Sequence, residues 1–118
     1  GLGHQVRDCL HPRDLASLLA LQLQAGDDRS KPRIANVSGG ASSARSLQQL
    51  SSWCTERWGS NQVRSNPEPR PYDLPWVVLD SHLSCDSWGW KPKISTENTL
   101  IEIALFAERN SEWIENSK

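Results

Sequence analysis

The sequence predicts an α/β fold, because three short extended segments alternate along the chain with three segments of helical periodicity. The extended segments lie near residues 6–10, 33–37 and 76–79, and the helical segments lie near residues 13–25, 46–58 and 96–109. The 118 residues suit a single small domain, 1–118. Three strands this short make only a thin sheet, so we expect the chain to complete a larger α/β fold.

The first extended segment leads directly into a helix signal. Pro12 and Asp14 suit the first turn of a helix, and Gly26 is a natural end for it. Between them the chain carries five leucines, at positions 15, 18, 19, 21 and 23. Because these leucines leave only a narrow polar stripe, the helix near 13–25 needs burial over most of its circumference.

The second extended segment, 33–37, ends at a Ser38-Gly39-Gly40 turn, and the clearest helix of the chain follows that turn. Ser46 suits the N-cap of this helix and Gly59 suits its end. Apolar residues recur between the two at helical spacing: Leu47, Leu50, Trp53, Cys54 and Trp58. The glycine turn is weakly similar to a phosphate-binding loop, but an ordinary turn before a capped helix is the favoured interpretation.

The second half of the chain begins with a stretch, 60–75, that regular structure cannot occupy, because it carries prolines at 67, 69, 71 and 75. The third extended segment, 76–79, follows it. Residues 81–87 fit one or two helical turns before Gly89. Ser95 suits the cap of a last helix near 96–109, which has Leu100 and Ala104 on its apolar side and Glu108 on its polar side.

Composition and charge exclude several classes of function. The 13 Lys and Arg residues against 14 Asp and Glu give a net charge of −1, which argues against nucleic-acid or membrane binding through bulk charge. The longest apolar stretch, 15–23, is far shorter than the ~20 residues that span a bilayer. The 3 cysteines are widely spaced and the 3 histidines lack metal-ligand spacing. We therefore expect reduced thiols, no metal site and a cytoplasmic location.

Two arginines are candidate binding residues. Arg7 lies within an expected strand, and Arg70 lies between prolines in a stiffened loop. Arginines on fixed backbone suit the forked contacts that a diphosphate needs. Ordinary ion pairs are the alternative: Arg7 with Asp8 or Asp14, and Arg70 with Glu68 or Asp73. Spacing alone favours these ion pairs.

Four segments, taken in order, resemble motifs of the extended short-chain dehydrogenase/reductases, the NAD-dependent epimerases and dehydratases of nucleotide sugars. They are residues 3–15 (GHQVRDCLHPRDL), 36–40 with 46–50 (NVSGG and SLQQL), 70–80 (RPYDLPWVVLD) and 89–100 (GWKPKISTENTL). Each motif is weak alone, but together they follow the family's order along most of the chain. The Gly-Gly turn and the helix around Trp53-Cys54 are most similar to the CDP-paratose 2-epimerase branch.

The resemblance implies that the chain is the C-terminal, substrate-binding segment of an extended short-chain dehydrogenase/reductase with a Rossmann-type fold. Arg7 and Arg70 would then hold the diphosphate of a nucleotide sugar, and Asp73 would support the loop that carries Arg70. NAD would be bound by the enzyme's own N-terminal Rossmann half, because the family's glycine-rich first loop and Tyr-x-x-x-Lys pair have no match here. We therefore expect no catalytic and no cofactor-binding residue in this chain, and no activity from it alone.

Two further expectations concern the parent enzyme. The chain has no Met and begins Gly-Leu-Gly, which fits a piece of a longer protein. A homodimer is one option for the assembly of that parent. The sequence leaves open which sugar and which base are bound, and whether the reaction is epimerisation, dehydration or reduction.

The alternative function is a free-standing, non-catalytic module that binds carbohydrate or another protein through some of its 6 tryptophans. The apolar helix near 13–25 argues against such a module. A chain this short would leave part of that helix exposed, which invites a larger partner.

Overall fold

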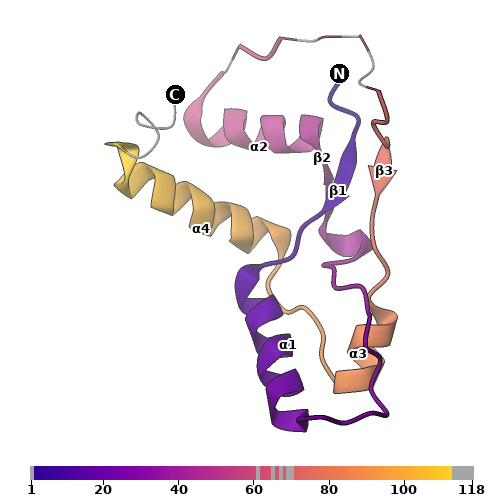
Figure 1. Cartoon of the computed structure of the whole chain (residues 1–118). Coiled ribbons are helices and arrows are strands. Elements are labelled where there is room, and N and C mark those ends of the chain that lie inside the picture. Colours follow the sequence, from indigo (N-terminus) through magenta and orange to yellow (C-terminus); the bar gives the residue numbers. More distant parts are fainter. Residues whose placement is uncertain (1, 61, 65, 67, 69–70, 113–118) are drawn as a thin grey trace.

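The computed structural model describes residues 2–60, 62–64, 66, 68 and 71–112, and it confirms the α/β class (Figure 1). Its strands are β1 (Val6–Asp8), β2 (Ala44–Ser46) and β3 (Trp76–Val77). Its α-helices are α1 (Pro12–Ala25), α2 (Leu47–Trp58), α3 (His82–Trp88) and α4 (Thr96–Arg109), and a single 3₁₀ turn, η1 (Ala41–Ser43), precedes β2.

The three strands form one mixed sheet in the order β2-β1-β3. β1 lies in the middle, antiparallel to β2 and parallel to β3. Arg7 is the central residue of the sheet, opposite Arg45 on β2 and Val77 on β3. Strands pair with β1 on both sides, so the backbone of Arg7 is held more firmly than that of a residue on either edge strand.

The prediction of a strand near 33–37 is wrong, because the second strand of the sheet is 44–46. Both edges of β1 are already paired, so the segment 33–37 has no free edge beside the central strand. Its Ile34 is 88% exposed, and the carbonyl of Asn36 accepts a hydrogen bond from the Ser84 hydroxyl instead of a ladder bond. The other two strands lie where predicted but are shorter than 6–10 and 76–79.

The helices agree closely with the predicted segments, since their ends are fixed by local capping. Pro12 occupies the first turn of α1. The Ser46 side chain accepts from the backbone N–H of Gln49, and the Gln49 side chain accepts from the backbone N–H of Ser46, which completes a capping box on α2. At α4 the Ser95 hydroxyl accepts from the backbone N–H of Asn98.

The apolar core of the described residues is small. Its buried hydrophobic residues are Leu18, Trp90 and Ala104. The indole N–H of Trp90 donates to the Asp14 carbonyl and the Ser17 hydroxyl, which ties the loop after α3 to α1. A carboxylate oxygen of Asp14 accepts from two backbone N–H groups, those of residues 93 and 94. Polar contacts of this kind therefore hold much of the fold together.

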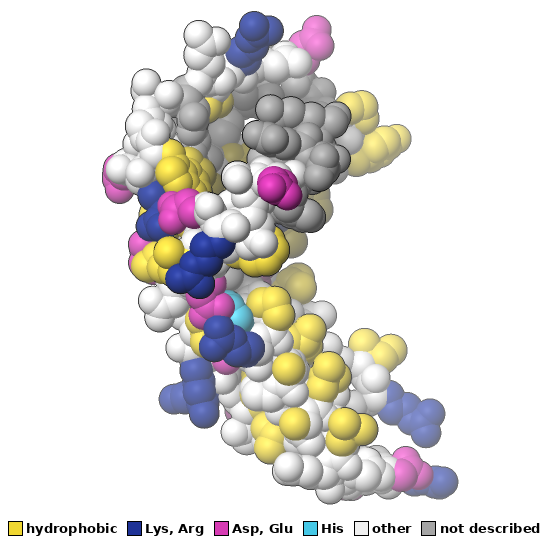
Figure 2. Space-filling model, turned by 90° about the vertical axis from the view of Figure 1, so that its left-hand side faces the viewer, with side chains coloured by type: hydrophobic (Ala, Val, Ile, Leu, Met, Phe, Trp, Pro, Cys, Tyr) yellow, Lys and Arg dark blue, Asp and Glu magenta, His cyan; other side chains and the backbone are white. Residues whose placement is uncertain are grey.

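α1 does not find the burial that its sequence requires. Leu18 faces the interior, but Leu15, Leu19 and Leu23 are 39%, 50% and 83% exposed. These three residues follow one another at i, i+4 spacing, so they form a continuous row on one side of the helix. Figure 2 shows hydrophobic side chains, in yellow, gathered over the lower part of the molecule, where α1 lies. We call Leu15, Leu19 and Leu23 the α1 leucine row.

Candidate functional site

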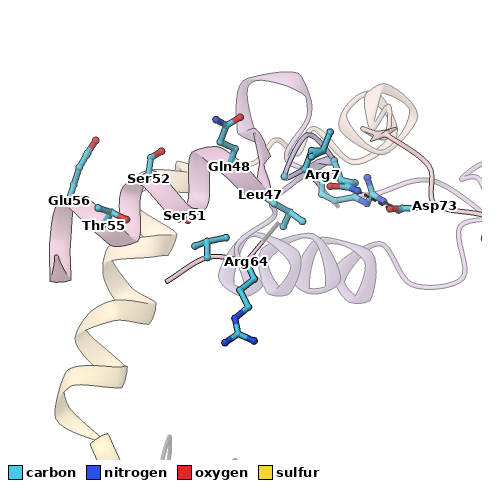
Figure 3. A pocket seen from close by; sticks show the side chains of 13 residues that line it. Arg7, Leu47, Gln48, Ser51, Ser52, Thr55, Glu56, Arg64 and Asp73 are labelled. Atoms are coloured by element: carbon cyan, nitrogen blue, oxygen red, sulfur yellow. Dashed lines mark hydrogen bonds and ion pairs between the residues drawn. The ribbon is translucent and has the colours of Figure 1, made fainter. Parts of the chain in front are cut away.

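A cavity with a volume of about 750 Å³ lies beside β1 and α2 (Figure 3). One wall comes from the start of the chain through β1, including Gln5 and Arg7. A second wall is the side of α2 that carries Leu47 and a group of hydroxyl side chains: Ser51, Ser52 and Thr55. Arg64 and Asp73 complete the lining from the segment between α2 and β3. The lining thus combines two arginines, the two carboxylates of Asp73 and Glu56, and several neutral polar groups.

Arg7 is presented to this cavity by the central strand. One guanidinium nitrogen lies 3.6 Å from a carboxylate oxygen of Asp73, and another donates to the Val6 carbonyl at 2.7 Å. The side chain is 44% exposed, so its remaining N–H groups face solvent or the cavity. An arginine that is anchored at one side and open at the other is suited to bind an anion.

The ion pair of Arg7 differs from both pairs that spacing suggests. Asp8 hydrogen-bonds the buried Ser38 hydroxyl, and Asp14 accepts from the backbone after Trp90. The actual partner is Asp73, 66 residues further along the chain. Arg70, the second arginine predicted to hold a diphosphate, lies outside the described residues.

Asp73 organises this corner of the cavity. It pairs with Arg7, and its second carboxylate oxygen accepts from the side-chain amide of Gln5 at 2.9 Å. Its side chain is 24% exposed, so the two bonds lie partly out of water and fix both neighbours. The segment after residue 70 is therefore joined to the strand side of the cavity through one carboxylate.

Two further cavity residues are absent from the sequence prediction. The sequence does point to Gln5, because residues 5 and 7 of an extended segment face the same side and Arg7 is already a candidate binding residue. Arg64 has no such signal, since it lies in an irregular segment and only the tertiary fold brings it to the cavity. In Figure 3 the Arg64 guanidinium points away from the Arg7–Asp73 pair.

The Ser38-Gly39-Gly40 turn is packed into the fold. A Cβ placed on Gly39 would lie 1.8 Å from the carbonyl oxygen of Cys9, so the two backbones are in close contact at this point. The Ser38 hydroxyl, which is buried, donates to a carboxylate oxygen of Asp8, lies 3.0 Å from the carbonyl oxygen of Leu79 and accepts from the N–H of Gly40. The Ser38 hydroxyl is therefore used within the fold, which agrees with an ordinary turn.

Clear pKa shifts among the described residues occur at exposed groups outside this cavity. Hydrogen bonds from Arg57 and Trp58 hold the pKa of Glu108 below its ordinary value, and hydrogen bonds from Arg13 and His11 do the same for the pKa of Glu102. A hydrogen bond to Asp80 raises the pKa of His82. Glu108 and Glu102 join α4 to α2 and to the start of α1, so their shifts belong to helix packing.

Within the described ranges, no group of three or more His, Cys, Asp or Glu side chains is arranged to hold a metal ion. None of the helices in those ranges is both long enough and apolar enough to cross a bilayer.

Solved structures provide the matches to this chain; no protein-family model matches it, and neither does any curated protein. The enzyme WbmG of Bordetella bronchiseptica, solved in complex with NAD, is 27% identical with a TM-score of 0.74. The match covers 90% of this chain and 32% of WbmG. A WbmG structure in complex with NAD and UDP gives 27% identity and a TM-score of 0.72, over 90% of this chain and 33% of that one.

A third structure is the UDP-glucose 4-epimerase of the hyperthermophilic eubacterium Thermotoga maritima, solved with UDP-glucose. It is 26% identical, its TM-score is 0.65, and the match covers 83% of this chain and 30% of the epimerase. The chain spans about a third of the length of each of these proteins. It therefore shares its α/β fold with one part of a UDP-glucose 4-epimerase and of the NAD-containing enzyme WbmG.

Proposed function

We propose that this chain is the nucleotide-sugar-binding part of an NAD-dependent sugar-nucleotide epimerase or dehydratase, and that it catalyses no reaction alone. The observation that carries the proposal is Arg7, an anchored but half-open arginine in the wall of a cavity of about 750 Å³. Two of the similar structures were solved with UDP or UDP-glucose, both of which carry a diphosphate.

The proposed contact is a charge-assisted hydrogen bond from Arg7 to a diphosphate oxygen. Its pairing with Asp73 at 3.6 Å is long for an ion pair, so an incoming phosphate competes with it favourably. Asp73 keeps Arg7 oriented before the ligand arrives, which lowers the entropy cost of binding. Arg70 belongs to the proposal as a second arginine, three residues before Asp73 in the sequence.

NAD belongs in this proposal to another part of the enzyme, an N-terminal Rossmann half. Hydride exchange between NAD and the sugar is the chemistry that the cofactor supplies when bound. The close contact of Gly39 with the Cys9 carbonyl supports a cofactor site outside this chain. The sequence has no Tyr-x-x-x-Lys pair for proton transfer, since Tyr72 is followed four residues later by Trp76. This chain would then contribute binding energy at a distance from the reacting carbon.

We include three further points in this proposal. The parent enzyme is related to the CDP-paratose 2-epimerase branch, lies in the cytoplasm and assembles as a homodimer. The α1 leucine row supports the existence of a larger partner unit, because a helix with apolar side chains on two sides is suited to lie between two layers. We assign that row to the remaining two-thirds of an epimerase-type fold, since this chain covers about a third of each similar structure.

One observation favours the alternative of a carbohydrate- or protein-binding module. Trp76, on the edge strand β3, is 62% exposed, and Tyr72 near it in the sequence is fully exposed. Exposed aromatic rings suit stacking on a sugar or docking on a protein. Such a module predicts binding through Trp76 with no requirement for a diphosphate.

The deciding experiment is isothermal titration calorimetry of the chain with UDP, CDP and dTDP. Arg7→Ala is expected to weaken the binding of the preferred nucleotide about 10- to 100-fold, because it removes a charge-assisted hydrogen bond. Arg45→Ala is the matched control: Arg45 lies opposite Arg7 on β2, bonds its own backbone neighbours and does not line the cavity. Epimerase activity from the isolated chain, or equal effects of the two substitutions, would contradict the proposal.

A further inference from the structure

His11 is a buried histidine that the proposed function does not use. It is 7% exposed and stands at the N-cap of α1. Its ring nitrogen Nδ1 accepts a hydrogen bond from the backbone N–H of Arg13, at 3.0 Å. Nδ1 must therefore carry a lone pair, so the proton of the neutral ring lies on Nε2. The tautomer of this side chain thus follows from its capping bond.

The other ring nitrogen joins α1 to α4. Nε2 of His11 lies 3.2 Å from a carboxylate oxygen of Glu102, and the proton on Nε2 makes the ring the donor of this hydrogen bond. The Arg13 guanidinium donates to the same carboxylate oxygen. Hydrogen bonds from Arg13 and His11 hold the pKa of Glu102 below its ordinary value, so Glu102 stays a carboxylate wherever a histidine titrates. The ring therefore bridges two helices, accepting on one side and donating on the other.

Few charged groups surround this ring. The charged side chains on the segments that adjoin His11 are Arg13 and Asp14 on α1, Glu102 on α4, Lys93 in the loop before α4 and Asp8 on β1. Asp14 accepts from the backbone N–H groups of residues 93 and 94, and Asp8 accepts from the Ser38 hydroxyl. The Lys93 side chain is exposed. Among the described residues, Glu102 is thus the carboxylate in contact with the ring.

We propose that His11 is a pH-sensitive link between α1 and α4: a second proton, taken up at Nδ1, breaks the cap of α1 while the contact with Glu102 holds. A protonated Nδ1 is a donor, and it then faces the N–H of Arg13, which is also a donor. One of these two groups has to move. The Nε2 side gains an ion pair with Glu102 because both partners are then charged, so the first turn of α1 yields rather than the ring.

Protonation thereby changes how α1 is held without unfolding the chain. The backbone N–H groups of Asp14 and Leu15 donate to the His11 carbonyl, so they belong to the same first turn. Leu15 is also the first member of the α1 leucine row. Acid is therefore expected to loosen the end of α1 at which that row begins. This inference goes beyond the proposed function, since it holds whichever ligand the cavity binds.

The test is a pH titration of the ¹⁵N-labelled chain, followed by NMR. At neutral pH we expect His11 to have an unprotonated Nδ1 and a protonated Nε2. The second readout is the hydrogen-exchange protection of the Arg13 and Leu15 amides, relative to an unstructured peptide at the same pH. As the ring takes up its second proton, this protection should fall about fivefold with the same midpoint, which is the usual effect of a lost N-cap.

His11→Asn separates the cap from the titration. The side-chain oxygen of asparagine can accept from the N–H of Arg13 and takes up no proton, so the protection of these amides should no longer change as it does in the unsubstituted chain. His4→Asn is the matched control, because His4 is exposed and lies outside α1. Its pH response should equal that of the unsubstituted chain.

The ring measurement needs no substitution, which covers the case in which His11→Asn does not fold. A proton on Nδ1 at neutral pH would overturn the inference, as would a ring that stays neutral until the whole chain unfolds in acid. Amide protection that stays constant while the ring titrates would overturn it too. A pH response that persists in His11→Asn would leave His11 as a structural cap only.

Discussion

Gly39 is a residue at which the described fold tolerates little change. A Cβ at this position would lie 1.8 Å from the Cys9 carbonyl oxygen and 2.7 Å from the Ser43 Cβ. The first neighbour is backbone at the end of the central strand, so it cannot move aside without shifting the sheet. The local fold therefore requires a residue without a side chain at position 39.

Gly39→Ala is expected to lower the free energy of unfolding by about 3 kcal/mol, which a small domain can hardly tolerate. Gly40→Ala is the matched control, because Gly40 has φ of 73° but open space around the added methyl. It should cost about 1–2 kcal/mol, from backbone conformation alone. Urea denaturation followed by tryptophan fluorescence measures both, and equal costs would contradict the steric argument.

The residues of the site were only partly predictable from the sequence. Arg7 was identifiable because a charge inside a strand stands out locally. Its pairing with Asp73 was not, because 66 residues separate the two and the nearer carboxylates, Asp8 and Asp14, are occupied elsewhere. Arg64 reaches the cavity only through tertiary structure.

At the scale of elements, α2 and α4 are joined by a polar and aromatic clamp. Arg57 on α2 donates two hydrogen bonds to Glu108 on α4, and the indole N–H of Trp58 donates to the same carboxylate. Arg57 also lies 5.8 Å and 5.6 Å from the ring centres of Trp53 and Trp58, which meet edge to face. Glu108 is therefore the acceptor through which most of the clamp is held.

The clamp makes a pH-dependent prediction. These hydrogen bonds hold the pKa of Glu108 below its ordinary value of 4.5, so the carboxylate is more stable in the folded chain than in the unfolded one. Its contribution to stability is fully present above pH 4.5 and is lost as the pH falls through the lowered pKa. The difference in free energy of unfolding between the unsubstituted chain and Glu108→Gln should thus be largest near pH 7 and shrink in acid.

Glu112→Gln, an exposed residue beyond the end of α4, is the control for this titration. Denaturation series at neutral and acid pH, read through the tryptophans, provide the comparison. A Glu108→Gln difference that stays constant with pH would show that the clamp does not depend on the charge of this carboxylate.

Elements differed in how far the sequence could predict them. The helices were placed well, because Ser46, Ser95 and Pro12 mark their first turns by local chemistry. The second strand was misplaced, because β2 is the short segment Ala-Arg-Ser, whose composition does not favour a strand. It becomes a strand by pairing with β1, whereas the more strand-like 33–37 finds no free edge beside that central strand.

The whole molecule is more extended than a domain of its length. Its radius of gyration is 17.5 Å, with extents of 51 × 35 × 25 Å, whereas about 13–14 Å is usual for a compact domain of this size. The small core and the α1 leucine row agree with that shape. These features suit a segment that wraps against a larger body, as the share of the similar structures that it covers also suggests.

The corresponding prediction concerns Leu19, at the centre of the row. In the isolated chain Leu19→Lys should change stability by about 0.5 kcal/mol or less, because the side chain is half exposed. In a chimaera in which this chain replaces the matching third of WbmG, the same substitution should lower the melting temperature by several degrees, since it places a charge in an apolar contact.

Gln24→Lys, on a polar position of α1, should have little effect in either context. Equal melting temperatures for the two substituted chimaeras would contradict the assignment of the row to the rest of the fold. An isolated chain that is a dimer, and that Leu19→Lys converts to a monomer in size-exclusion chromatography with light scattering, would assign the row to a second copy instead.

The alternation of side chains along the central strand links ligand binding to the accuracy of folding. Gln5 and Arg7 face the cavity, while Asp8 bonds the buried Ser38 hydroxyl. If β1 paired one residue out of step, Asp8 would take the place of Arg7 and present a negative charge to the cavity. An anion bound through Arg7, as we propose, would therefore stabilise only the molecules whose sheet is correctly paired.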